Sequence, residues 1–190
     1  MPVQIGQKPE HGFDEPLGLL SDCHRRIERF LEIMLRVARS ERSSALSGAS
    51  RDAMQQALQY FRVAGPRHTA DEEESLFPVL RTSSEQSDAA HEVLERADEL
   101  EQEHRILDSA HAVVDELASQ WLDGPLSEEE AGRLIHTLES LRNTYERHIG
   151  FEDRELFPAA AQILTPEQIE GIGRQMAERR GIPFRRSSAD

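Results

Sequence analysis

The sequence predicts an all-α protein: an antiparallel up-down-up-down four-helix bundle with a short C-terminal extra helix. Apolar residues recur every three or four positions in four long segments, as on the buried face of a helix. The connections between these segments are short, which favours antiparallel neighbours, and no segment has a convincing strand pattern. With 190 residues, the chain is also long enough to bury a sizeable core.

The first two helices are expected over residues 17–39 and from residue 51 onward, with a Ser-rich loop between them. The first helix has an apolar stripe that includes His24, and its other members are Leu20, Ile27, Leu31, Met34 and Ala38. The second helix carries His68 on its inner face. Because Pro66 removes a backbone donor and crowds a carbonyl one turn earlier, we expect this helix to be distorted, or to restart, just before His68.

The third helix is expected over residues 85–122, where the sequence Asp-Gly-Pro ends it, and His104 lies on its apolar stripe. Ser127 followed by Glu130 is the pattern of a capping box and predicts the start of a fourth helix. The inner face of that helix includes His148. Each of the four helices therefore has a histidine directed toward the core.

A short last helix should open at Thr165 and Pro166, because Thr is a good N-cap and Pro suits the first helical position. The residues after it form a polar tail. We therefore expect an N-terminal extension over 1–16, the bundle over 17–160, and the short helix with its tail over 161–190.

The charge balance excludes several classes of partner. The chain has 22 basic and 36 acidic residues, and its net charge of −14 repels phosphate backbones and anionic lipid headgroups. No apolar run approaches the length of a transmembrane helix, and the first residues lack the basic and apolar blocks of a signal peptide. We expect a cytoplasmic protein with no nucleic-acid or membrane partner. The single cysteine, Cys23, excludes an intramolecular disulfide framework.

A repeat connects the two halves of the chain. The stretch RHTADEEESLFP, residues 67–78, resembles RHIGFEDRELFP, residues 147–158, with every matched position displaced by 80 residues. His24 and His104 show the same displacement. Each half thus supplies one helix with a core-facing His and one with a His-x-x-x-Glu motif, which suggests duplication.

The motif spacing indicates a metal site. On a helix, residues four apart share a face, so His68 and Glu72 can reach one centre, as can His148 and Glu152. Burying two ionised carboxylates beside four imidazoles is costly unless cations neutralise them, and a dinuclear metal site supplies that compensation. Imidazole with carboxylate suits iron, zinc, copper or manganese, and the absence of paired cysteines argues against thiolate zinc or iron–sulfur sites.

These residues resemble those of the hemerythrin-like, or HHE cation-binding, family. The resemblance runs from about Leu17 to Pro158 and rests on the two isolated histidines and the two His-x-x-x-Glu motifs, each followed by Leu-Phe-Pro. It implies two non-haem iron ions in a helical bundle, with zinc or manganese as substitutes. One iron would be held by His24 and His68 and the other by His104 and His148, while Glu72 and Glu152 bridge the pair.

One departure from the family pattern concerns the number of imidazoles. Oxygen-carrying hemerythrins have a fifth His one turn after that of the third helix, and here that position is Asp108. Two six-coordinate ions offer about twelve positions, of which four imidazoles, two bridging carboxylates and one shared oxygen fill about ten. The rest could take a small ligand such as dioxygen, peroxide or nitric oxide, or be closed by Glu28 or Asp108. Simple reversible oxygen carriage is not what this pattern favours.

Several neighbouring residues receive simpler interpretations. His111 is interpreted as a hydrogen-bonded core residue in preference to a ligand, and Tyr145 as either a hydrogen-bond donor near the site or a packing residue. Cys23 is interpreted as buried packing. Leu-Phe-Pro is expected to seat the helix end in the core, and a solvated acidic face is expected from Asp71, Glu73 and Glu74.

Three classes of function follow from these observations. The preferred one is a non-haem di-iron binding protein that senses, stores or handles iron and small oxidants. The alternatives are a peroxide-consuming, catalase-like di-iron enzyme and a structural bundle that the metal stabilises. The sequence alone does not assign an enzymatic activity, because fold analogy does not select a physiological role.

Overall fold

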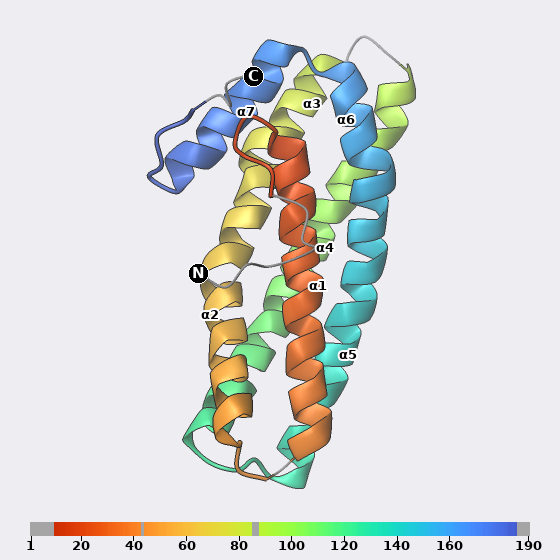
Figure 1. Cartoon of the computed structure of the whole chain (residues 1–190). Helices are drawn as coiled ribbons and strands as arrows, with labels where there is room; N and C mark the ends of the chain where they lie inside the picture. Colours follow the sequence, from red (N-terminus) through yellow and green to blue (C-terminus); the bar gives the residue numbers. More distant parts are fainter. Residues whose placement is uncertain (1–9, 43, 85–87, 186–190) are drawn as a thin grey trace.

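Four long helices form the body of the molecule. The computed structural model describes residues 10–42, 44–84 and 88–185, and within these ranges all regular structure is helical. The long helices lie side by side, and the colours of Figure 1 run in alternating directions along α1 (Pro16–Glu41), α2 (Gly48–Asp71), α4 (Asp88–Asp123) and α5 (Glu128–Phe151). Both α1 and α4 pack against α2 and α5. The expected all-α bundle is confirmed.

The expected helix starts are also present. Ser127 and Glu130 form a reciprocal capping box at the start of α5. Thr165 caps α7 (Pro166–Arg179) in the same way, with Gln168 as its partner. These side chains satisfy backbone groups that the first helical turn leaves without partners.

Pro66 does not interrupt its helix. The helix α2 is continuous from Gly48 to Asp71, so the expectation of a restart before His68 is wrong. The irregular turn comes directly after α2, where the π-helical segment η1 (Glu72–Leu76) leads into α3 (Phe77–Ser84). The second half repeats this arrangement, with η2 (Glu152–Leu156) followed by α6 (Phe157–Ile163).

Prolines explain the position of both π-helical turns. Pro78 and Pro158 lack a backbone N–H, and each ring would crowd the carbonyl four residues earlier in a regular α-helix. A wider turn relieves this crowding, and the residues before the prolines, Phe77 and Phe157, donate to the carbonyls of Glu72 and Glu152, five residues back. The Leu and Phe of each motif are buried as expected, but both helices continue beyond them instead of ending there.

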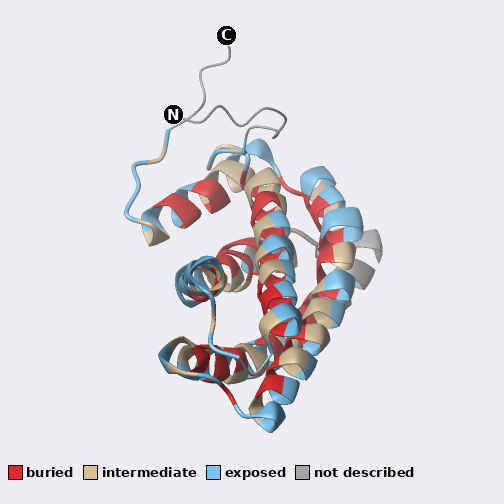
Figure 2. Ribbon diagram, turned by 60° about the horizontal axis from the view of Figure 1, so that its bottom comes forward, coloured by how far each residue is buried: buried red, intermediate tan, exposed pale blue. Residues whose placement is uncertain are grey.

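Among the described residues, the buried apolar side chains form two clusters. One includes Ile27 and Leu107, and the other includes Leu20 and Leu100. On α1 and α4 the residues between these clusters are His24 and His104, so a buried polar layer separates the two apolar parts. Figure 2 shows buried residues along the inward faces of the helices and exposed residues on their outer faces.

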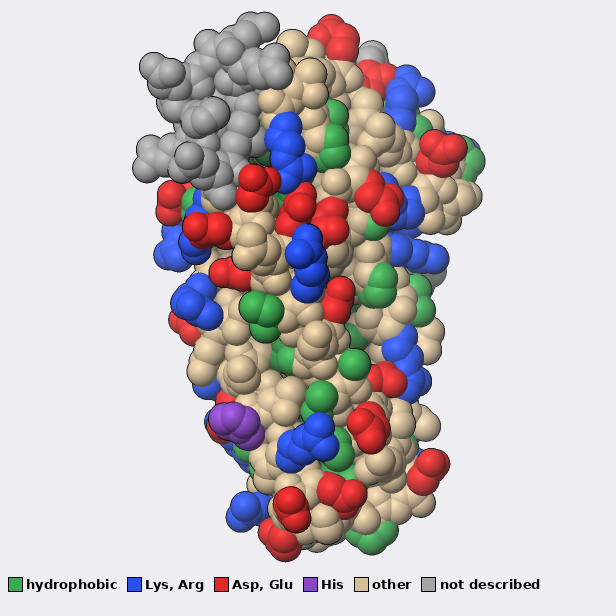
Figure 3. Space-filling model, turned by 180° about the vertical axis from the view of Figure 1, so that it is seen from behind, with side chains coloured by type: hydrophobic (Ala, Val, Ile, Leu, Met, Phe, Trp, Pro, Cys, Tyr) green, Lys and Arg blue, Asp and Glu red, His purple; other side chains and the backbone are tan. Residues whose placement is uncertain are grey.

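The outer surface is strongly charged. Figure 3 shows acidic and basic side chains interspersed over the face opposite that of Figure 1, with only scattered apolar side chains between them. No helix in the described ranges is long and apolar enough to cross a membrane.

The helix α7 contacts α1 and α2, and its Gly173 closely approaches the backbone of the segment that precedes α1. A Cβ added to Gly173 would collide with the backbone carbonyl of Phe13, whereas one added to Gly171 would meet nothing within 4 Å. We expect Gly173→Ala to lower the free energy of unfolding by about 1–3 kcal/mol, because a backbone carbonyl cannot easily move aside. Gly171→Ala is the matched control and should stabilise the protein by about 0.5–1 kcal/mol through helix propensity. Denaturant unfolding of both variants measures this, and equal stability of the two would contradict the close contact.

Candidate metal centre

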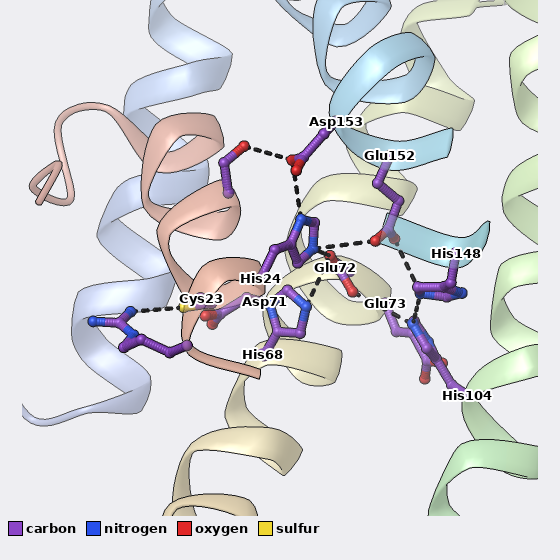
Figure 4. Close-up of polar contacts among 12 residues, drawn as sticks. Cys23, His24, His68, Asp71, Glu72, Glu73, His104, His148, Glu152 and Asp153 are labelled. Atoms are coloured by element: carbon purple, nitrogen blue, oxygen red, sulfur yellow. Dashed lines mark hydrogen bonds and ion pairs between the residues drawn. The ribbon is translucent and has the colours of Figure 1, made fainter. Parts of the chain in front are cut away.

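The six residues singled out in the sequence come together at one place in the bundle. Each of the four long helices contributes one imidazole, and the first residue of each π-helical turn contributes one carboxylate. Figure 4 shows these side chains directed toward one another. All six are buried: His24, His68, Glu72, His104, His148 and Glu152.

Their donor atoms form two groups that share both glutamates. His24, His68, Glu72 and Glu152 offer atoms that all lie within 4.8 Å of one another, and so do Glu72, His104, His148 and Glu152. The two oxygens of Glu72 face opposite groups, with Oε1 3.5 Å from His68 Nε2 and Oε2 3.5 Å from His104 Nε2. Glu152 does the same, with Oε2 3.2 Å from His24 Nε2 and Oε1 3.3 Å from His148 Nε2. Each carboxylate therefore spans the two groups.

These separations fit the edges of coordination polyhedra. Ligand atoms about 2.1 Å from an ion lie about 3.0 Å apart at a right angle and about 3.4 Å apart at a tetrahedral angle. The Nε2 atoms of His104 and His148 are 3.0 Å apart, within the range that ligands of one ion require. Their outer nitrogens donate to carboxylates, so two lone pairs would face each other here unless a proton or a cation lies between them.

The polar atoms at the centre lack partners. Both oxygens of Glu72, both oxygens of Glu152 and Nε2 of His24 are buried, and none has a hydrogen-bond partner within the described part of the chain. A buried acceptor without a partner costs about 1–3 kcal/mol, and more if it is charged. Coordination of cations would satisfy all of these atoms at once, so the donor set fits a pair of metal ions.

Electrostatics within the cluster lead to the same conclusion. Burial, and then the charge of Glu152, raise the pKa of Glu72. Burial also opposes ionisation of Glu152, but the imidazoles of His148 and His24 outweigh it and lower the pKa of that carboxyl. Burial disfavours the charged form of His148, yet Glu152 beside it raises its pKa to about 9. Without a cation, protons bound by the cluster reduce the repulsion between its buried carboxylates. Divalent ions would displace these protons.

A comparison with known families agrees with this geometry. The family model described as the hemerythrin HHE cation binding domain matches residues 15–160. The chain belongs to the hemerythrin family. No curated protein matches the chain. Family membership implies cation binding, and the buried His and Glu groups of this hemerythrin domain could hold the metal.

Three carboxylates orient imidazoles of the hemerythrin centre, and none of the three was predicted from the sequence. His24 Nδ1 lies 3.0 Å from Asp153 Oδ1, His104 Nδ1 lies 2.8 Å from Glu73 Oε1, and His148 Nδ1 lies 2.9 Å from Glu103 Oε2. Such bonds fix the tautomer, so that Nε2 faces the centre with its lone pair. The repeat contained a signal for two of them, because Glu73 and Asp153 are both acidic and are displaced by 80 residues.

The acidic run near Glu72 is not the solvated face that its sequence predicts. Only Glu74 is largely exposed, since Glu73 binds His104 and Asp71 is fully buried. Asp71 accepts hydrogen bonds from Arg179 and Arg180 at the end of α7. The prediction failed because these arginines lie 108 and 109 residues after Asp71, so no local sequence pattern connects them with it.

Glu28 and Asp108 lie outside both groups of donor atoms. Both side chains are exposed, and Asp108 lines a cavity of about 290 Å³ between α2 and α4. Three of the four centre imidazoles, those of His68, His104 and His148, also line this cavity. A small molecule in the cavity would therefore reach the centre of the hemerythrin domain from the side of α2 and α4.

His111 and Tyr145 line the same cavity and contact each other, with His111 Nε2 2.9 Å from the Tyr145 hydroxyl. Burial lowers the pKa of His111 to about 4, so its imidazole is neutral near pH 7 and can accept the phenolic proton. The interpretation of His111 as a hydrogen-bonded residue agrees with this contact. Cys23 is buried, and Arg26 donates to its sulfur at 3.0 Å.

Proposed function

We propose that this hemerythrin-family protein binds two non-haem iron ions, bridged by Glu72 and Glu152, and uses them to sense, store or handle iron and small oxidants. The main support is the pair of buried carboxylates, Glu72 and Glu152, whose oxygens have no hydrogen-bond partner in the described ranges. The two oxygens of each carboxylate face opposite groups of imidazoles. Mixed imidazole and carboxylate ligands suit iron, with zinc or manganese as substitutes. Bound iron would supply one-electron redox chemistry and affinity for small oxygen or nitrogen ligands.

The cavity favours a centre that small ligands reach over a purely structural metal site. Its walls include apolar side chains such as Leu58, Phe61 and Leu107, and its inner end reaches the imidazoles of His68, His104 and His148. Dioxygen, peroxide and nitric oxide are small and weakly hydrated or neutral, so they can pass through such a space. A metal that serves only to hold helices together needs no such route.

Purification under anaerobic conditions, followed by metal analysis and an optical spectrum, tests this proposal. We expect about two iron ions per chain and visible charge-transfer absorption after oxidation. A colourless protein with stoichiometric zinc would instead favour the structural bundle. A protein without bound metal, which also fails to take up iron, would contradict the proposal.

A peroxide-consuming enzyme is the second candidate, and the His111–Tyr145 pair favours it. A phenol and a neutral imidazole in hydrogen-bond contact can donate and accept protons beside a ligand in the cavity. Turnover of peroxide, measured as oxygen release by the iron-loaded protein, separates this candidate from a sensor or store. Tyr145→Phe should lower that turnover without removing iron.

Asp108→His should weaken binding of azide to the ferric protein by about tenfold or more, because the new imidazole would occupy the open coordination position. An imidazole at this cavity position, four residues after His104, could fill the place that azide would take. Azide titration followed by visible absorption measures the effect. Ser109→His is the control, because Ser109 is on the same helix and does not line the cavity. Unchanged azide affinity in Asp108→His would show that no open position lies within its reach.

A further inference from the structure

We infer, resting on the proposed dinuclear centre, that its two metal positions are unequal. The position formed by His104 and His148 binds its ion more tightly than the position formed by His24 and His68. The reason is that, among the described residues, a carboxylate contacts the outer nitrogen of His24, His104 and His148 but not that of His68.

The tighter position has two oriented imidazoles. Glu73 accepts from His104 Nδ1 at 2.8 Å, and Glu103 accepts from His148 Nδ1 at 2.9 Å. The Glu73 and Glu103 side chains are 35% and 23% exposed, so both carboxylates retain contact with water. An ionised acceptor makes a neutral imidazole a better electron donor to a metal.

The weaker position has only one imidazole that a carboxylate orients, that of His24. Asp153 accepts from His24 Nδ1 at 3.0 Å, but His68 Nδ1 is buried and has no hydrogen-bond partner in the described ranges. Figure 4 shows Asp153 beside His24 and draws no polar contact to the outer nitrogen of His68. Within the described ranges, no hydrogen bond therefore fixes the tautomer of His68 or strengthens it as a ligand.

The repeat explains this difference. Asp153 and Glu73 are displaced by 80 residues and serve equivalent histidines in opposite halves. The position equivalent to Glu103 in the first half is residue 23, which is Cys23. Its sulfur accepts from Arg26 and is a weak acceptor in any case, so it does not replace the missing carboxylate at His68.

The expected size of the difference follows from the general effect of such hydrogen bonds. Removing the acceptor that binds the outer nitrogen of a metal-bound imidazole typically lowers metal affinity by about 10–100-fold. The ion at the His24 and His68 position should therefore enter second and leave first. The protein would pass through a state with one tightly bound ion when metal is limiting.

Titration of the metal-free protein with Co²⁺ against a chromophoric chelator tests this inference. Repulsion between two ions would by itself separate two binding steps, so the deciding comparison uses the repeat-related variants His68→Ala and His148→Ala. Each variant leaves one position intact. We expect the tightest step of His68→Ala to match that of the wild type, and the tightest step of His148→Ala to be weaker by about 10–100-fold.

Glu103→Gln tests the cause without removing a ligand, and should weaken the first step by a similar factor. Glu116→Gln, an exposed change on the same helix, is the matched control and should leave the first step unchanged. Equal affinities in His68→Ala and His148→Ala, or an unaffected first step in Glu103→Gln, would overturn the inference while leaving the dinuclear centre standing. A wild-type protein that binds no Co²⁺ would instead overturn the proposed function.

Discussion

Glu72→Ala and Glu152→Ala should each retain less metal than His24→Ala. Each glutamate places one oxygen in each group of donor atoms, so its loss removes a ligand from both positions. It also leaves the two ions with less negative charge between them. His24 belongs to only one group, so His24→Ala should keep about one ion, while the glutamate variants should fall well below one.

Metal-to-protein ratios after purification from identical cultures decide this prediction. Glu155→Ala is the matched control, because Glu155 lies in the same π-helical turn as Glu152 but is exposed. This control should keep the wild-type metal content. A full complement of two ions in Glu152→Ala would remove Glu152 from the centre.

Removal of metal should lower the melting temperature substantially. Ligand binding at free ion concentrations of about 1,000 times Kd stabilises a protein by about 4 kcal/mol per site, so two sites give about 8 kcal/mol. For a chain of this size, each kcal/mol shifts the melting temperature by about 2–4 °C, so the expected drop is roughly 15–30 °C. The physical reason is that the metal-free protein leaves buried carboxylate oxygens without partners.

Thermal unfolding with and without a chelator measures this drop. The double variant Glu72→Gln and Glu152→Gln provides the control, because it should bind little metal and should therefore melt at the same temperature under both conditions. If the wild-type protein also melted at one temperature with and without chelator, the metal could not lie in the core of the bundle.

The fold and the six central residues were predictable from the sequence for one physical reason. Helical periodicity determines which side chains face inward, so a histidine within an apolar stripe, such as His24 or His104, must lie in the core. The i, i+4 spacing likewise places Glu72 beside His68. These conclusions need only local geometry and the repeat.

The outer partners of the imidazoles were not predictable in the same way. Glu103 lies one residue before a core histidine, and whether it reaches His148 depends on how α4 and α5 are rotated and offset against each other. The burial of Asp71 and its contact with Arg179 depend on where α7 docks. The residues near Asp71 in sequence do not indicate that position. The π-helical turns had a visible cause in Pro78 and Pro158, but the choice between a kink and a widened turn depends on packing.

The 80-residue repeat makes the two groups of donor atoms counterparts of each other, and both groups share the two glutamates. Half of the chain alone would contribute two histidines and one glutamate, and two such halves related by rotation would rebuild the whole centre as an isologous dimer. The contacts of Asp153 with His24 and of Glu73 with His104 cross from one half to the other, as the contacts of such a dimer would. Joining the halves in one chain removes the requirement that both stay identical. Cys23 and Glu103, which occupy equivalent places with different chemistry, show a symmetry that the single chain has been free to break.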